Sequence, residues 1–377
     1  MSSGWPIGAG KCGSLIASKC GQWGIGGGWK WIGGVTNTSQ ILSVAWSPTA
    51  GPGGTGLFCG VGYFNGSYTS PDGLTWTAHS ASSGNYYLGI CWSPALGKFC
   101  AVGYVSSSGS GGANLLGVTM TSSDGINWTT NSTITGIGLT AVCWSPTAQG
   151  GCFCAVGWRG QGSPAASAQV YTSTNGSSWT VQVAPVLNTY YGNSWTGISW
   201  STTANCFCAV CSYNIYTTSN QPMTSPDGIT WTLQTMPTSQ DSYSSICFSP
   251  TAGAGGTGLF CAVGPAHAGG GAVIATSPDG STWTPQTPVA AQNWGGAAGN
   301  GPLICWSASF NLFCVIDYKT SGADTWQAMT SPDGITWTGE RIPTTGTVIS
   351  TYKACCCASD SVICEAGYQK SAIRQSS

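Results

Sequence analysis

Charged side chains are scarce in this sequence. Asp, Glu, Lys and Arg make up 6% of its 377 residues, whereas about 25% is usual for soluble proteins. Basic residues number 10 and acidic residues 11, so the formal net charge is -1. A nucleic-acid-binding protein needs clustered cations to neutralise phosphates, and the chain has no basic stripe. We therefore expect no nucleic-acid partner.

Long apolar runs are missing as well. No stretch approaches the ~20 consecutive apolar residues of a membrane helix, so we expect no membrane insertion. The N-terminus, MSSGWPIGAGKCGS, lacks the continuous apolar segment of a secretory signal. If the protein is located on a virion or an extracellular surface, it reaches that place without a recognisable signal peptide, for example by release with a virion.

Histidine is almost absent, with only His79 and His267. A histidine-rich metal site is therefore excluded, and no Ser-His-Asp arrangement can be argued. The cysteines follow the repeat spacing described below rather than paired CxxC motifs, which argues against zinc. We predict no metal and no cofactor.

Three short motifs recur along the chain. An aliphatic-Trp-Ser-Pro motif, as in ICWSP, is followed by Phe-Cys-Ala-Val-Gly and then by Thr-Ser-Pro-Asp-Gly with Trp-Thr, as in the identical nine residues at 224–232 and 330–338. The aromatic residues of the first motif stand at Trp46, Trp92, Trp144, Trp200, Phe248 and Trp306. A period of roughly 50 residues with several strand-like segments is typical of a β-propeller.

Each repeat is predicted to form four strands and no helix. The third and fourth strands meet at Asp-Gly, the favoured centre of a two-residue type I′ hairpin. Asn175 replaces Asp in one copy, which indicates a structural role for this position. The predicted structural turn residues are Asp72, Asp124, Asn175, Asp227, Asp279 and Asp333.

Six full repeats are visible, and the tail contains half of another. Residues 351–377 supply three strand-like segments and end where the Asp-Gly should follow, while residues 28–40 resemble a fourth strand. We therefore predict an all-β fold: a seven-bladed β-propeller of four-stranded antiparallel blades, closed by an N-terminal strand. Residues 28–377 form this single domain, and residues 1–27 are a Gly-rich N-terminal arm.

The Ser-x-Asp-Gly-x-Thr-Trp segments resemble the Asp-box (BNR) repeats of sialidases and other propellers, over about 340 residues. They are one residue shorter between Asp and Trp than the usual Asp box. The resemblance implies a propeller, and in sialidases it accompanies three substrate-binding arginines and a Tyr-Glu pair. This chain has three arginines in all, and its ERIP segment (340–343) follows a fourth strand instead of preceding the first Asp box.

An enzymatic site is not expected. Glycoside hydrolysis needs two carboxylates facing each other across the bond. Five of the eleven carboxylates lie in the predicted turns, and no motif pairs the others, although Asp317 and Asp324 share one loop. We predict a non-enzymatic protein, with a sialidase-like glycoside hydrolase as one alternative.

Nineteen cysteines occur, most at two repeated strand positions. A simple hairpin places Cys91 opposite Cys100 and Cys305 opposite Cys314, which allows cross-strand disulfides. In other repeats Cys59 faces Ala45 and Cys208 faces Ser199. These partnerless copies favour free thiols packed between blades, and the disulfide alternative stays open.

Function is predicted on the face of the ring that carries the second-to-third strand loops and the connections between blades. These loops are long and varied, and variable loops on a rigid repeat are where binding is usually built. Aromatic faces beside amides and hydroxyls suit sugars, although the same side chains could serve only to pin the loops. The predicted ligand-binding residues are Trp158, Arg159, Tyr190, Tyr191, Trp195, Trp294, Asp317, Tyr318 and Trp326.

The repeats, the low charge and the Gly/Ser/Thr content also resemble those of SPDGITWT-repeat bacteriophage structural proteins. We therefore predict a virion- or surface-associated protein, such as a fibre, spike or capsid-decorating subunit. Its N-terminal arm would bind other virion or surface proteins, with host-surface glycans as candidate ligands. A free carbohydrate-binding lectin is the other alternative.

Overall fold

The structure is a computed structural model. It describes residues 41–63, 66–73, 75–80, 85–106, 115–131, 133–158, 170–185, 194–212, 221–237, 241–265, 272–289, 301–316 and 328–340, and for 30–31, 352–357, 362–367 and 371–375 the backbone alone. The predicted arm, residues 1–27, lies outside these residues.

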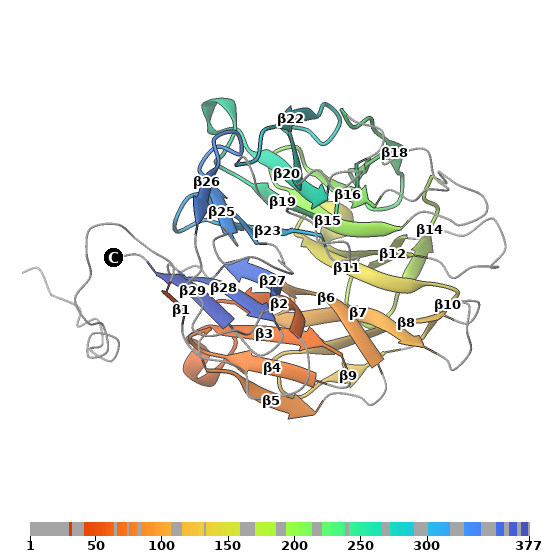
Figure 1. The fold of residues 1–377 in the computed structure, drawn as a ribbon. Helices are drawn as coiled ribbons and strands as arrows, with labels where there is room; N and C mark the ends of the chain where they lie inside the picture. The colour runs from red at the N-terminus through yellow and green to blue at the C-terminus, as the bar shows by residue number, and fades with distance from the viewer. Residues whose placement is uncertain are drawn as a thin grey trace, which may run out of the picture.

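Seven antiparallel sheets surround a central axis (Figure 1). We use "blade" for a sheet whose strands follow one another along the chain, and six of the sheets are blades in this sense. Their first strands lie side by side around the axis, in chain order.

The first three blades contain β2 (Ile41–Ser47), β3 (Leu57–Gly62), β4 (Gly66–Ser70) and β5 (Thr77–Ser80); β6 (Asn85–Ser93), β7 (Lys98–Ser106), β8 (Leu115–Ser122), β9 (Thr129–Thr130) and β10 (Ile134–Thr135); and β11 (Gly138–Ser145), β12 (Cys152–Trp158), β13 (Val170–Ser173) and β14 (Thr180–Gln182). The other three contain β15 (Trp195–Ser201), β16 (Cys206–Cys211), β17 (Met223–Ser225) and β18 (Thr232–Leu233); β19 (Ser245–Ser249), β20 (Leu259–Pro265), β21 (Ala272–Ser277) and β22 (Thr284–Gln286); and β23 (Leu303–Ser307), β24 (Leu312–Ile316), β25 (Ala328–Ser331) and β26 (Thr338–Glu340).

The remaining sheet, which we call the closing sheet, joins the two ends of the chain. It contains β27 (Tyr352–Cys357), β28 (Val362–Gly367), β29 (Ser371–Gln375) and β1 (Lys30–Trp31). Strand β1 pairs with β29 through Lys30↔Ile373 and Trp31↔Ala372, the pairing that the sequence predicted. The sheet lies between β23 and β2.

The prediction of seven four-stranded blades needs correction. Six blades are present, because the closing sheet takes its outer strand from the other end of the chain and so has no Asp-Gly turn between its third and fourth strands. The second blade is also not four-stranded, since both β9 and β10 pair with β8. Among the described residues the only helical segments are three short 3-10 turns, η1 (Pro52–Gly54), η2 (Ala148–Gly150) and η3 (Ala254–Gly256).

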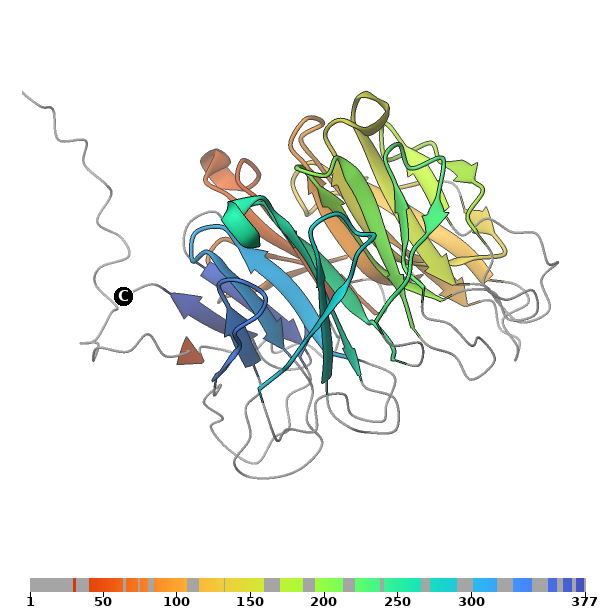
Figure 2. The same cartoon turned by 90° about the horizontal axis from the view of Figure 1, so that it is seen from above.

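The two faces of the ring differ in their turns. The 3-10 turns and the Asp-Gly turns lie on one face, which we call the short-turn face (Figure 2). The opposite ends of the strands form the long-loop face.

The three repeated motifs meet inside each blade. In the first blade the ring of Phe58 lies between Trp46, with centroids 4.5 Å apart, and Trp76, at 6.5 Å. The fourth blade repeats the arrangement with Phe207 between Trp200 and Trp231. Tilted aromatic pairs at such separations stabilise a core beyond simple burial, so one residue from each motif contributes to the packing of its own blade.

The sequence predicted type I′ hairpins at the Asp-Gly turns, and this prediction is wrong. Pairing of the strands ends at Thr121↔Thr129, so the turn spans residues 122–128. Gly125 has φ +72°, whereas no turn aspartate has a positive φ. The Asp124 carboxylate accepts hydrogen bonds from the N–H groups of Ile126 and Asn127, both at 2.8 Å. The turn is therefore organised by a side chain rather than by two left-handed residues.

Further hydrogen bonds complete this turn. Ser122 Oγ donates to Asp124 at 2.9 Å and accepts from Gly125 N at 2.8 Å, while the indole N–H of Trp128 donates to the Gly125 carbonyl at 3.0 Å. Asn175 makes the same contacts through its amide oxygen with Ser177 N and Ser178 N, at 2.8 and 2.9 Å. The side-chain oxygen of Asp or Asn therefore holds the turn together in both blades.

Candidate functional site: an aromatic row on the long-loop face

Of the predicted ligand-binding residues, the structure describes two, Trp158 and Trp195. Those outside the described residues are Arg159, Tyr190, Tyr191, Trp294, Asp317, Tyr318 and Trp326.

Trp195 is not a surface residue. It begins β15, is 0% exposed, and packs in a core between the third and fourth blades with Val156 and Val170. The prediction that it contacts a ligand is therefore corrected: Trp195 belongs to the interior.

Trp158 ends β12 and is half-buried on the long-loop face. Its ring meets Tyr104 edge-on at 5.9 Å. Tyr104 stacks on Tyr86 at 5.2 Å with an 18° angle between the rings, and Tyr86 meets Tyr63 edge-on at 5.3 Å. All four are half-buried. Together they form a continuous row of rings across the first three blades, which we call the aromatic row.

Strand register places these rings together. Tyr86 and Tyr104 are directly paired between β6 and β7, and directly paired side chains on one face of a sheet lie about 5 Å apart. Tyr63 follows the end of β3, and Trp158 pairs with Gly138 at the start of β11. The row therefore rests on strand ends, which are more rigid supports than loops.

Gly138 provides the space that the row needs. A β-carbon at this residue would lie 3.0 Å from Nε1 of Trp158 and 3.5 Å from the β-carbon of Tyr104. Any larger residue would push the indole away, so Gly138 determines how closely Trp158 and Tyr104 pack against the start of β11.

The phenol groups of the row influence one another. Burial raises the pKa of Tyr104, and the neighbouring phenols of Tyr63 and Tyr86 raise it further. Tyr104 therefore keeps its proton at physiological pH. The row offers ring edges and phenol groups to a ligand on this face.

Sequence reasoning missed Tyr63, Tyr86 and Tyr104 because it weighed the long loops and gave less attention to the strand ends. A signal for two of them was present: NYYLGICWS and KFCAVGYVS are antiparallel segments on either side of one short turn, and extending their register pairs Tyr86 with Tyr104.

The described acidic and thiol groups have other roles. In Asp124, partial burial raises the carboxyl pKa, but the hydrogen bonds from Asn127, Ile126 and Ser122 outweigh this effect and lower it to about 2. Burial raises the pKa of Cys211 to about 12 and that of Cys152 to about 11, so these thiols are neutral.

The cysteines whose side chains the structure describes are free thiols. Among the described residues no cluster of three or more His, Cys, Asp or Glu side chains is suited to a metal. None of its helical segments is long and apolar enough to cross a membrane.

Solved structures resemble this fold over nearly the whole chain. YCF48 bound to a D1 peptide is 16% identical, with a TM-score of 0.57, over 93% of this chain and 95% of that one. YCF48 from Cyanidioschyzon merolae is also 16% identical, with a TM-score of 0.56 over 92% and 98%. Virginiamycin B lyase from Staphylococcus aureus is 9% identical, with a TM-score of 0.61 over 92% and 99%.

The chain is a β-propeller. Likeness at these identities shows the fold alone, and the similar structures include both lyases and YCF48. No family model matches the sequence, and neither does any curated protein sequence.

Proposed function

We propose that this propeller is a non-enzymatic binding protein and that its long-loop face binds neutral, hydroxyl-rich ligands, namely carbohydrates. The aromatic row is the observation that carries the proposal. Four half-buried rings from three blades form one surface. Ring edges and phenol groups suit a ligand that presents C–H groups and hydroxyls together.

Charge supports the same ligand class. The chain has a net charge of -1 and 6% charged residues, so it has little long-range field with which to attract an ionic ligand. The described turn aspartates lie at the opposite ends of the strands, where their oxygens hold turns. Binding would then depend little on salt.

As part of the same proposal, the protein acts on a virion or another surface, where many copies stand together. One aromatic contact contributes only about 0.5–1.5 kcal/mol, so a single site is weak. Multiple copies on one particle raise the avidity without new contacts.

A glycan array with multivalent, full-length protein tests the proposal. We expect Trp158→Ala and Tyr63→Ala to reduce binding at least about fivefold, the equivalent of one aromatic contact, while both variants stay folded by circular dichroism. Ile335→Ala is the matched control, because Ile335 is 57% exposed in an Asp-Gly turn on the other face. Binding that survives both aromatic changes, or that the control also removes, contradicts the proposal, as does turnover of any bound glycan.

A further inference from the structure

Tyr86 and Tyr104 are placed for a chemical reaction that ligand binding does not use. Their rings are nearly parallel, at an angle of 18°, with centroids 5.2 Å apart, so the atoms that face each other lie closer still. A phenol that loses one electron and its proton becomes a radical whose unpaired electron is shared between the oxygen and the ortho carbons. Two such radicals held side by side can couple through these carbons to dityrosine.

Strand register holds the two phenols side by side. Tyr86 and Tyr104 are directly paired between β6 and β7. Directly paired residues of antiparallel strands project from the same face of the sheet, and the two side chains have the same length, so their hydroxyl-bearing ends lie together. On β8 the partner of Tyr104 is Gly117, so no side chain at that position competes with Tyr86 for the Tyr104 ring.

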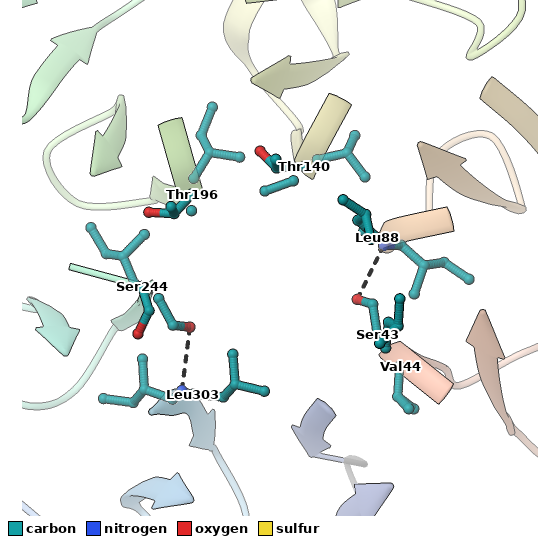
Figure 3. Close-up of a pocket in the computed structure, with 17 residues that line it drawn as sticks. Ser43, Val44, Leu88, Thr140, Thr196, Ser244 and Leu303 are labelled. Atoms are coloured by element: carbon teal, nitrogen blue, oxygen red, sulfur yellow. Dashed lines mark hydrogen bonds between the residues drawn. The ribbon is translucent and has the colours of Figure 1, made fainter. Parts of the chain in front are cut away.

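The pair also lies where its strands can adjust. Strand β6 begins one residue before Tyr86, and β7 ends two residues after Tyr104. A bulge between Tyr87 and Gly89 interrupts the pairing, and Leu88 at this bulge lines the cavity on the ring axis (Figure 3). Strand ends open at a lower cost in free energy than strand centres. The two rings can therefore move together as a bond forms between them.

The neighbours of the pair decide where coupling occurs. Tyr86 and Tyr104 are half-buried, so a small oxidant can reach them from the long-loop face. Tyr63 lies at 81° to Tyr86, and this edge-on contact sets the edge of one ring against the face of the other. Such a contact is less suited to joining two ortho carbons than the stacked contact with Tyr104. The stacked pair is therefore the favoured position for a bond.

We propose that Tyr86 and Tyr104 are an oxidative cross-linking site, at which a one-electron oxidant of the high-valent metal class joins β6 to β7 through dityrosine. Each phenol gives one electron to the oxidant and its hydroxyl proton to water. One carbon–carbon bond forms between two ortho carbons, and the hydrogens on these carbons then move to the oxygens, which restores both phenols. Two equivalents of oxidant are reduced for each bond. The site does not depend on glycan binding.

Photo-oxidation of the dilute, full-length protein tests this proposal. The oxidant is a ruthenium(III) tris-bipyridine complex, generated by light and persulfate. We expect dityrosine fluorescence in the monomer band of a denaturing gel. Mass spectrometry of the digested protein should show Tyr86 and Tyr104 in one linked peptide, which is lighter by two hydrogen atoms than the sum of its two parts.

Phenylalanine variants supply the controls, because they keep the ring and remove only the phenol group. Tyr104→Phe should remove this linkage while the circular dichroism spectrum stays unchanged, and Tyr63→Phe, the matched control, should keep it. Oxidation in urea should abolish the preference for this pair. A dominant Tyr63–Tyr86 linkage, linkage between chains only, oxidised tyrosines without any linkage, or equal Tyr86–Tyr104 linkage in the unfolded chain overturns the proposal.

Discussion

A β-carbon built on Gly228 would lie 3.0 Å from Cγ2 of Thr172 in the preceding blade. The same relationship joins Gly125 to Thr69, Gly176 to Thr121, and Gly280 to Thr224, at 2.8–3.0 Å. Each glycine also has a positive φ, between +72° and +78°. The repeated Asp-Gly turn is therefore a joint between neighbouring blades, and this role explains why it recurs.

Replacement of Gly228 by Ala should cost about 1–3 kcal/mol in the free energy of unfolding, because an L side chain resists this backbone conformation. The close approach to Thr172 adds to that cost. Thr172→Ser removes Cγ2 but keeps the oxygen that accepts from Gln182 Nε2 at 2.8 Å. The double variant should therefore lose less than the sum of the single losses in urea unfolding. Strict additivity would show that the two residues do not press on each other.

The loss of folding stability at low pH should come from the turn aspartates. In Asp227, partial burial raises the carboxyl pKa, but the N–H groups of Thr230 and Ile229 and the Ser225 hydroxyl lower it overall. The pKa of Asp279 and of Asp333 is lowered in the same way. Because the folded-state pKa lies below the unfolded value of about 3.9, the stabilisation is complete above pH 4 and is lost as the pH falls further.

Asp227→Asn tests this. Its melting temperature at pH 7 should stay close to that of the parent, since Asn175 fills the equivalent position in another blade. The decrease in melting temperature between pH 5 and pH 3 should be smaller than in the parent chain. An equal decrease in both proteins would remove Asp227 from the acid transition.

The loss of folding stability at high pH should come from the buried cysteines. Burial raises the pKa of Cys100 and of Cys261 far above the usual thiol range, and that of Cys206 to about 11. Thiols of the unfolded chain ionise near pH 8.5, while the folded thiols stay neutral. Stability is therefore complete below pH 8.5 and decreases as the pH rises towards the folded-state values.

Thiol labelling tests the same burial. At pH 8 we expect iodoacetamide to leave Cys100 and Cys208 unmodified in the folded protein and to label both after denaturation, as peptide mass spectrometry would show. A Cys91–Cys100 disulfide in the freshly purified protein would contradict the free thiols.

Hydrogen bonds from hydroxyl groups near the axis to carbonyls of the next blade should stabilise the ring. Thr196→Val removes the hydrogen bond to the Tyr243 carbonyl and leaves that acceptor without this donor, which should cost about 1–3 kcal/mol. Thr147→Val is the matched control, since Thr147 bonds to Asn205 of the next blade at an exposed position, at 2.7 Å. Its effect should stay below about 0.5 kcal/mol. Equal losses in both variants would contradict a special role for the axial hydroxyls.

Much of the fold followed from the motifs alone. Cys91↔Cys100, Cys305↔Cys314, Cys59↔Ala45 and Cys208↔Ser199 are paired as predicted, because short turns leave little choice of register. The turn type was wrong, since the Asp and Ser side chains replace the backbone bonds of a type I′ turn. The blade count was wrong because half a repeat and an N-terminal strand make a sheet without that turn.

The site was harder to predict because the strands extend beyond their motifs. The recognised segment of β15 begins at residue 198, yet the strand begins at Trp195. That extension places the indole inside, whereas the sequence predicted a loop at this residue. Strands β6 and β7 also extend past their motifs, and this brings Tyr86 and Tyr104 together.

Trp158 and Trp195 should therefore respond differently to truncation. Trp195→Ala empties a position that is 0% exposed and should cost about 3–5 kcal/mol, as buried aromatic truncations do. Trp158→Ala removes a half-buried ring at the end of β12, so the loss should stay below that range. Urea unfolding of the two variants, followed by circular dichroism, measures both. If Trp158→Ala were the more destabilising change, the aromatic row would be part of the core and unsuited to binding.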